Sequence, residues 1–255
     1  MYSRLEQHLR SSTFVRRCFY VLRYGKIQSK QNRVFYLKKI IEKTGVDLVI
    51  DVGANVGQFI SDLTIAGYSN KVLAIEPLPA ASKFLIGKKF KKLDVHVVAK
   101  GLSSNFSKSG ILNVGSNLGM SSSLLEPTVN HFYLDSKTSF EEKIYIETLS
   151  LSDLIEVFPE IKSSRILLKL DVQGYERDIL EMFVSSNLNV SACIVETSMV
   201  PLYEDGGNFY STSALLSKLN QRVVFNKMNG YLTEASGWSY CDLYTIDAGY
   251  FVEKL

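Results

Sequence analysis

The amino-acid sequence predicts an α/β fold built on a mostly parallel sheet flanked by helices, and three observations support this prediction. From residue 45 onward, short apolar runs alternate with amphipathic, helix-like stretches, which is the pattern of repeated βαβ units. A glycine turn, Gly53 to Gly57, follows directly on the first apolar run. Four of the predicted strands end in Asp51, Glu76, Asp171 and Glu196, at the edge where open α/β sheets bind their ligands.

The individual elements follow from this alternation. Short runs rich in β-branched residues predict strands at 48–51, 71–76, 95–99, 144–148, 166–171, 192–196, 221–227 and 242–247. Apolar residues at helical spacing predict helices at 28–40, 58–66, 80–90, 151–158, 176–183 and 212–219. We expect the last strands to form an antiparallel edge. Residues 103–140 are rich in Ser, Asn and Gly with little periodicity, and this predicts a long functional loop.

Composition is that of a soluble globular protein: 255 residues, 46% hydrophobic and 22% charged. The three cysteines, Cys18, Cys193 and Cys241, form neither a CxxC pair nor a Cys/His metal spacing, so we expect a reducing compartment and no metal. No apolar run reaches the roughly 20 residues that span a bilayer, and the N-terminus lacks the features of a secretory signal. These observations favour a cytoplasmic protein.

Positive charge is concentrated at the N-terminus. Residues 1–44 hold eleven Lys and Arg and two acids, a net charge of +9, so the remaining chain carries −6 of the total +3. We therefore divide the chain into a basic, helical N-terminal extension, residues 1–44, and a main domain, residues 45–255. The extension either packs an apolar stripe on the domain with its arginines solvated, or lies on the anionic inner face of a membrane or on an anionic substrate. No nucleic-acid-binding motif accompanies it.

The glycine turn narrows the choice of ligand. The dinucleotide pattern G-x-G-x-x-G is broken because Asn55 occupies its second glycine position, and no Walker lysine follows Gly57. A turn that has Asp51 at its mouth and no phosphate-binding lysine suits a ligand with an amine, a carboxylate and a sulfonium, which is S-adenosylmethionine. Glu76, at the tip of the second strand, is well placed to accept both ribose hydroxyls. The alternative is that the glycines only shape a tight turn.

Two further strands end in acids, Asp171 and Glu196. Their position at the carboxyl ends of parallel strands favours a functional role. A carboxylate there can also cap the following helix. For Asp171 both roles remain open, because a helix-like stretch starts a few residues later.

Six motifs, taken in order, resemble the FkbM-type methyltransferases: DVGANVGQF, AIEP, AKGLSS, ETLSLSDLI, LLKLDVQGYERDIL and IVETSMVPLYE. The resemblance covers about residues 45 to 247. It implies the class I methyltransferase (Rossmann-like) fold, with a mostly parallel seven-stranded sheet flanked by helices. It also implies O-methylation with S-adenosylmethionine, as in tailoring enzymes for polyketides, glycolipids or surface polysaccharides.

The resemblance also assigns cofactor-binding residues. The methionine end would contact the glycine turn, Glu76 would take the ribose hydroxyls and Pro77 would border the adenine, so the expected set is Asp51, Gly53, Asn55, Gly57, Phe59, Glu76, Pro77, Gly101, Leu102, Ser103 and Asp171. Ser104 replaces an acid that is usual in the family, and Gln173 stands where many relatives carry Glu.

Methyl transfer to an alcohol requires alignment of the reactants and a base that removes the hydroxyl proton. Asp171 is the first candidate for this base, followed by Glu196 and His131. The segment Ser116–Ser123 has the glycines and hydroxyls of a lid that closes over the substrate, and we expect Ser121–Ser123 to touch cofactor or acceptor. Residues 203–210 combine aromatic and polar groups, which suits a sugar ring.

We therefore expect an S-adenosylmethionine-dependent O-methyltransferase that acts on a hydroxyl of a sugar, a glycan or a glycan-linked metabolite. Two alternatives stay open: a non-catalytic S-adenosylmethionine-binding or scaffold protein, and an NAD-linked oxidoreductase, against which the broken dinucleotide pattern counts. The expected partner is a small-molecule or glycan substrate, and a homo-oligomer is also open.

Overall fold

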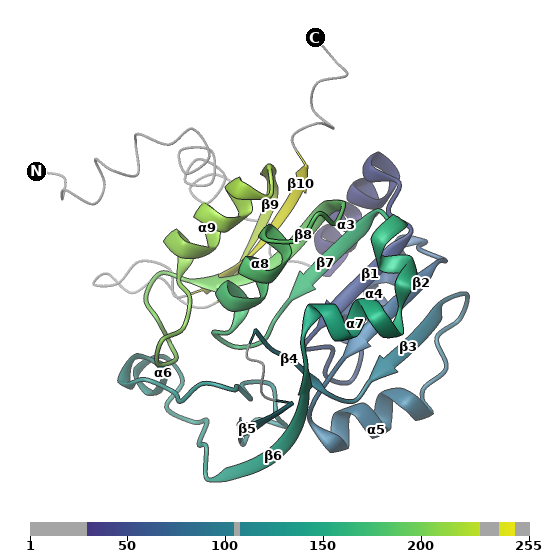
Figure 1. Cartoon of the computed structure of the whole chain (residues 1–255). Helices are drawn as coiled ribbons and strands as arrows, with labels where there is room; N and C mark the ends of the chain where they lie inside the picture. Colours follow the sequence, from purple (N-terminus) through teal and green to yellow (C-terminus); the bar gives the residue numbers. More distant parts are fainter. Residues whose placement is uncertain (1–29, 105–107, 230–239, 248–255) are drawn as a thin grey trace, which may run out of the picture.

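A seven-stranded sheet forms the centre of the molecule (Figure 1). The computed structural model describes residues 30–104, 108–229 and 240–247. The strand order is β3-β2-β1-β7-β8-β10-β9, with bounds β1 Leu48–Val52, β2 Lys71–Ile75, β3 Asp94–Val98, β7 Ile166–Leu170, β8 Val190–Ser198, β9 Gln221–Asn229 and β10 Tyr240–Asp247. The first five strands in this order pair in parallel, and β10 runs antiparallel to both β8 and β9. The predicted parallel sheet with antiparallel last strands is confirmed.

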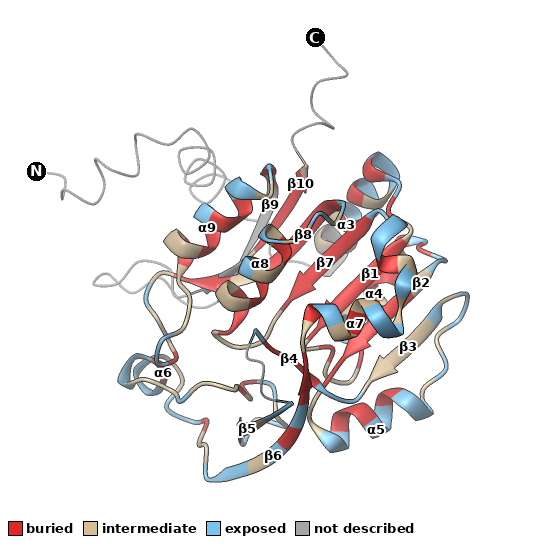
Figure 2. Cartoon of the chain, in the orientation of Figure 1, coloured by how far each residue is buried: buried red, intermediate tan, exposed pale blue. Residues whose placement is uncertain are grey.

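Helices cover both faces of this sheet. One face packs against α7 Leu151–Val157, α8 Glu176–Val184 and α9 Phe209–Lys218, and the other against α3 Lys30–Thr44, α4 Gln58–Ala66 and α5 Pro79–Gly87. Alternate residues of β1 divide between the two cores, since Leu48 and Ile50 face α7 to α9 while Val49 faces α3 to α5. The central strands are accordingly buried along their length (Figure 2).

Helix α3 belongs to the core of the domain. Its Leu37 and Ile40 are buried in the cluster that holds α4 and β1. Residues 33–44 of the predicted basic extension therefore pack on the domain through an apolar stripe, while residues 1–29 lie outside the described residues. Over the residues that the structure describes, no helix combines the length and hydropathy that a bilayer crossing requires.

The segment predicted as one long loop contains regular structure. It includes β5 Ser109–Val114 and α6 Val129–Leu134, and β5 pairs with β6 Glu142–Leu149, which in turn pairs with β4 Gly101–Leu102. The strand predicted at 144–148 is thus present, but it belongs to this second, three-stranded sheet. The second sheet and α6 lie beyond the carboxyl ends of the main strands (Figure 1). The prediction of one structureless insert was wrong because the polar composition of 103–140 conceals pairing with a distant strand.

The turn after β1 runs against the end of β7. A Cβ atom on Gly53 would lie 1.9 Å from the Asp171 carbonyl oxygen, and the residue has φ +78°. Only glycine fits this close approach of two backbones.

Gly53→Ala tests this contact against a matched glycine. Gly67 also has a positive φ, +88°, but a Cβ there would meet nothing within 4 Å. Gly67→Ala should cost only backbone strain, about 1–2 kcal/mol, and Gly53→Ala clearly more, because the turn must also move away from β7. Urea unfolding measures both free energies. Equal losses of unfolding free energy in the two variants would contradict the close approach of Gly53 to the Asp171 backbone.

Candidate active site

A cavity of about 960 Å³ opens at the carboxyl ends of the parallel strands. Its described lining includes residues at the carboxyl ends of β1, β2, β7 and β8, residues of α3, α4, α6 and β10, and most of residues 117–124 of the insert. Ten of the predicted site residues line it: Gly53, Asn55, Phe59, Glu76, Pro77, Gly101, Leu102, His131, Asp171 and Glu196. The topology therefore brings together residues that lie up to 143 positions apart in the sequence, from Gly53 to Glu196.

Glu76 connects the second strand to the glycine turn. Its Oε2 accepts the backbone N–H of Asn55 at 2.7 Å, and its Oε1 accepts that of Leu78 at 2.8 Å. Burial raises the pKa of this carboxyl, and the two backbone donors oppose the rise. Each oxygen keeps further acceptor capacity on the cavity side, so the carboxylate can take two additional hydroxyl donors.

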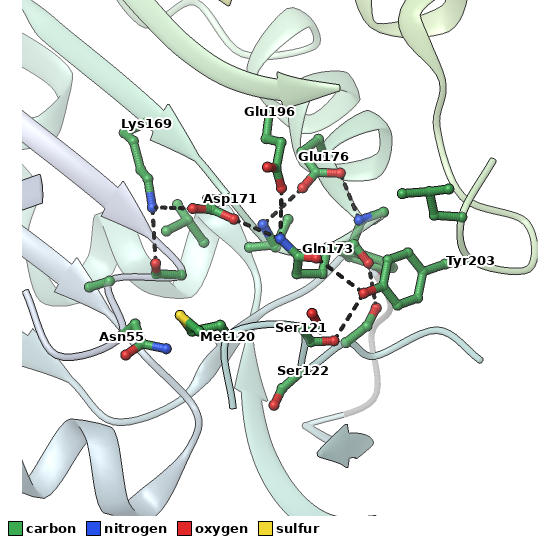
Figure 3. Close-up of a pocket in the computed structure, with 18 of the residues that line it drawn as sticks. Asn55, Met120, Ser121, Ser122, Lys169, Asp171, Gln173, Glu176, Glu196 and Tyr203 are labelled. Carbon is green, nitrogen blue, oxygen red and sulfur yellow. Dashed lines mark hydrogen bonds and ion pairs between the residues drawn. The ribbon is translucent and has the colours of Figure 1, made fainter. Parts of the chain in front are cut away.

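The side chain of Lys169 points toward Asp171 at the mouth of the site (Figure 3). Lys169 is the register partner of Asp51 across β1 and β7. Its ammonium donates to the carbonyl oxygen of Gly53 at 3.0 Å and lies 3.2 Å from Asp51 Oδ1 and 3.4 Å from Asp171 Oδ2. Burial alone would lower the pKa of Lys169, but the two carboxylates outweigh burial and raise it. Lys169 is therefore a charged link between the turn and both acids.

Three predicted cofactor residues lie behind the cavity surface. Asp51 is fully buried beneath Lys169, and burial raises its pKa. Gly57 starts α4 in a left-handed conformation, and a Cβ there would meet Phe90 at 2.7 Å. Ser103 is buried and its hydroxyl hydrogen-bonds that of Tyr175 at 3.2 Å. These three residues shape the walls of the site from behind.

Asp171 and Glu196 meet at the carboxyl ends of β7 and β8, as their positions predicted. The amide nitrogen of Gln173 bridges them, donating to Asp171 Oδ1 at 2.9 Å and to Glu196 Oε2 at 2.7 Å (Figure 3). Burial, followed by the nearby Asp171 carboxylate, raises the pKa of Glu196 well above its usual range. Asp171, in contrast, is ion-paired with Lys169.

The turn between β7 and α8 is held from inside by Glu176. Its Oε1 accepts the backbone N–H of Val172 at 2.8 Å and its Oε2 that of Gly174 at 2.9 Å. Burial raises the pKa of Glu176 to about 7 even against these donors. The helix-capping role that the sequence left open for Asp171 is not observed, because α8 has no side-chain cap at its N-cap residue, Tyr175, and Glu176 holds the turn before the helix instead.

His131, the third candidate base, lies on α6. It is 5% exposed and lines the cavity. The rings of Phe132, Phe140 and Tyr203 surround it with centroids 5.0–5.8 Å away. Burial lowers its pKa, and its Nδ1 has no hydrogen-bond partner among the described residues. The imidazole is therefore neutral and able to accept or donate one hydrogen bond.

Several lining residues were not predicted from the sequence. Arg33 of α3 forms a two-atom hydrogen bond with Asp62 of α4, from Nε at 2.9 Å and Nη2 at 2.7 Å to the same oxygen. A lone lysine in the apolar strand ILLKL was the available signal for Lys169. Nothing local in the sequence signals the pairing of Arg33 with Asp62, which are 29 residues apart.

Strand order and site geometry together define the fold class of the protein. A parallel sheet with one antiparallel strand inserted before the last position, an acid at the tip of β2 and a glycine turn after β1 make up the class I methyltransferase fold. The chain belongs to the FkbM methyltransferase family, since the model of the methyltransferase FkbM domain matches residues 51–235. It is therefore a methyltransferase that depends on S-adenosylmethionine, and the oxidoreductase alternative was wrong.

Solved structures with similar folds are distant in sequence. A Listeria monocytogenes protein classed as an S-adenosylmethionine-dependent methyltransferase is 11% identical over 86% of this chain and 97% of its own, with a TM-score of 0.45. Magnesium protoporphyrin IX methyltransferase from Synechocystis, with bound S-adenosylmethionine, is 11% identical over 86% of this chain and 79% of its own, with a TM-score of 0.45. A Leishmania major S-adenosylmethionine-dependent methyltransferase is 10% identical over 85% of this chain and 72% of its own, with a TM-score of 0.41. No curated protein matches the chain at a significant level.

The residues present fit this cofactor. Acidic side chains outnumber basic ones on the described cavity lining by seven to two, which favours a ligand with a positive sulfonium and amine. Glu76 would hold the ribose, and the turn containing Gly53 and Asn55 would face the methionine end.

Glu176 makes the stability of the protein depend on pH. Its pKa is about 7 in the folded state and about 4.3 in an unfolded chain. The stability that this raised pKa contributes is therefore fully present below about pH 4.3, the pKa in the unfolded chain, and is lost as the pH rises through about 7. Between acidic and mildly alkaline pH, the unfolding free energy of the wild type should fall by about 4 kcal/mol relative to Glu176→Gln. Urea titrations across this range measure the difference, and parallel pH profiles would contradict the prediction.

Proposed function

We propose that this protein transfers a methyl group to a hydroxyl of a neutral sugar, glycan or glycan-linked metabolite. The observation that supports the proposal is the charge of the cavity. Its described acidic lining residues are Asp62, Glu76, Asp135, Asp171, Glu176, Glu196 and Asp242. Carboxylates accept hydrogen bonds from hydroxyl groups, so a polyol that donates many such bonds suits this lining.

Anionic acceptors suit this acidic cavity lining poorly. The two basic side chains on the described lining are Arg33 and Lys169. Arg33 pairs with Asp62 at 2.7 Å, and Lys169 lies between two carboxylates. A phosphate or carboxylate on the acceptor would therefore meet like charges, which is costly in a buried site.

Asp171 is the proposed base. S-adenosylmethionine, when bound, supplies a methyl group on a positively charged sulfur. The acceptor oxygen would bond to the methyl carbon as the bond from that carbon to sulfur breaks, which would leave a neutral thioether, S-adenosylhomocysteine, and the hydroxyl proton would pass to the Asp171 carboxylate. The Lys169 ammonium at 3.4 Å and the Gln173 amide at 2.9 Å orient this carboxylate. A base placed in this way typically contributes 10²- to 10⁴-fold to the rate.

Glu196 and His131 take other roles in this proposal. Burial raises the pKa of Glu196 well above its usual range, which favours the protonated form of the carboxyl, so we assign Glu196 the role of a hydrogen-bond donor beside Asp171 rather than that of the base. His131 offers a neutral imidazole with an unpaired Nδ1. It is available to bind an acceptor hydroxyl, and the aromatic rings around it provide apolar faces for a sugar ring.

The cellular setting is also a proposal. We place the protein in the cytoplasm, in polysaccharide or glycolipid biosynthesis. The net charge of +9 over residues 1–44 supports peripheral contact with an anionic membrane surface, although residues 1–29 lie outside the described part. Self-association into a homo-oligomer belongs to the same proposal.

A matched panel of acceptors tests the proposed substrate class. Transfer of labelled methyl from S-adenosylmethionine should be detected with neutral methyl glycosides and should be weaker by an order of magnitude or more with the corresponding phosphorylated sugars and uronic acids. Mass spectrometry of the product should locate the methyl on oxygen. Transfer only to anionic acceptors would contradict the substrate class, and no turnover on any acceptor would favour the non-catalytic alternative.

Asp171→Asn tests the base. The amide keeps the shape of the side chain but cannot take the proton, so kcat should fall about 10²- to 10⁴-fold with S-adenosylhomocysteine affinity unchanged. Asp94→Asn is the control, because Asp94 is exposed at the start of β3, at the opposite end of the strands. Full activity of Asp171→Asn would remove the assigned role.

A further inference from the structure

Gln173 has more polar contacts in the cavity than its place beside the acids suggests. Its amide nitrogen reaches Asp171 and Glu196, and its amide oxygen accepts the hydroxyl of Tyr203 at 3.1 Å. Its backbone oxygen accepts the hydroxyl of Ser123 at 2.7 Å. Figure 3 shows the side chain extended between the two acids on one side and the tyrosine on the other.

An amide matches its partners in this arrangement. It presents two N–H donors at one end and a carbonyl acceptor at the other. Each carboxyl of the Asp171 and Glu196 pair receives one of the two donors, and the Tyr203 hydroxyl fixes which end faces the acids. A glutamate of the same length would put a third carboxyl between two others.

The backbone at this position is strained in order to aim the side chain. Gln173 has φ +55°, in the left-handed region that residues with a Cβ rarely adopt. The two backbone bonds to Glu176 hold the turn in this conformation. Gly174 lets the Tyr203 ring approach so closely that a Cβ would lie 2.8 Å from it. Strain of this kind, supported from both sides, is typical of functional positions.

Gln173 also joins the insert to the proposed base. The Tyr203 hydroxyl lies 3.0 Å from the backbone oxygen of Ser121, and Ser123 donates to the backbone of Gln173. Ser121 and Ser123 both line the cavity. The position of the insert and the orientation of the two acids are therefore linked through one amide.

We propose that Gln173 is a positioning residue for methyl transfer: its amide nitrogen holds the carboxyls of Asp171 and Glu196 on either side, and Tyr203 fixes the amide from behind. This inference rests on the proposed function, in which Asp171 accepts the acceptor proton. Gln173 itself takes no proton. It keeps one carboxyl oxygen of Asp171 occupied and sets the orientation of the carboxylate toward the acceptor.

Gln173→Glu tests the proposal. The substitution keeps size and removes both donors, so kcat should fall about 10²-fold through misplacement of the base, with little change in S-adenosylhomocysteine affinity. The acid limb of the kcat–pH profile should also move to higher pH by about one unit or more, because three neighbouring carboxyls resist ionisation. The other charged or titratable groups that face this cluster are Asp51, Lys169, Glu176, Tyr203 and Asp242.

Two further variants make the result specific. Tyr203→Phe keeps the ring on Gly174 but removes the hydroxyl, and it should lower kcat several-fold without moving the pH profile. Gln221→Glu is the matched control, since Gln221 is a buried glutamine on β9 whose amide donates to Val190 outside the cavity. It should lower stability and leave the pH profile of kcat unchanged.

The outcomes separate the two claims. If the wild type transfers methyl to no hydroxyl acceptor, or if Asp171→Asn is fully active, the proposed function fails. If both of those tests succeed but Gln173→Glu keeps the wild-type kcat and pH profile, only the role of Gln173 is overturned. If Gln173→Glu does not fold, Tyr203→Phe decides: reduced kcat supports the positioning role, and unchanged kcat overturns it.

Discussion

The arrangement of the cavity depends on one buried lysine between two carboxylates. Lys169 projects from the middle strand of the sheet and contacts the Gly53 carbonyl, Asp51 and Asp171 within 3.0–3.4 Å. Taking these charges out of water is costly, and removing one member of such a group typically costs about 3–5 kcal/mol because a buried charge is left unpaired. The lysine thereby fixes the turn after β1 and the turn after β7 in one relative position, and both turns line the cavity.

This constraint also sets the chemistry of the cavity. Because Lys169 is committed to Asp51 and Asp171, and Arg33 to Asp62, no unpaired cation lines the described part of the cavity. The lining therefore favours a cationic cofactor and an uncharged, hydroxyl-rich acceptor. The acids are not equivalent either. The pKa of Glu196 is raised well above its usual range, whereas Asp171 is ion-paired with Lys169, and such a difference in environment separates a proton donor from a base.

Much of this architecture could be predicted from local pattern. The location of the site at the carboxyl ends of the strands could be predicted from the glycine turn after β1 and the acid at the tip of β2, because parallel strands end at one edge of the sheet. Contacts set by tertiary packing could not be predicted in this way. The bridge from Gln173 to Tyr203 spans 30 residues, and the second sheet pairs segments whose polar composition resembles a loop. The burial of Asp51 beneath Lys169 likewise follows from register between two strands, which a single strand does not reveal.

The central claim is that the cavity binds S-adenosylmethionine with its ribose on Glu76. Calorimetric titration with S-adenosylhomocysteine of wild type, Glu76→Ala and the surface control Glu156→Ala tests it most directly. We predict micromolar binding by the wild type and by the control, and a loss of at least about tenfold in Glu76→Ala, because a hydrogen bond to a charged group contributes roughly 1.5–3 kcal/mol. Urea unfolding establishes that the variant is folded. Absence of binding by the wild type, or equal affinity in a folded Glu76→Ala, would contradict the account.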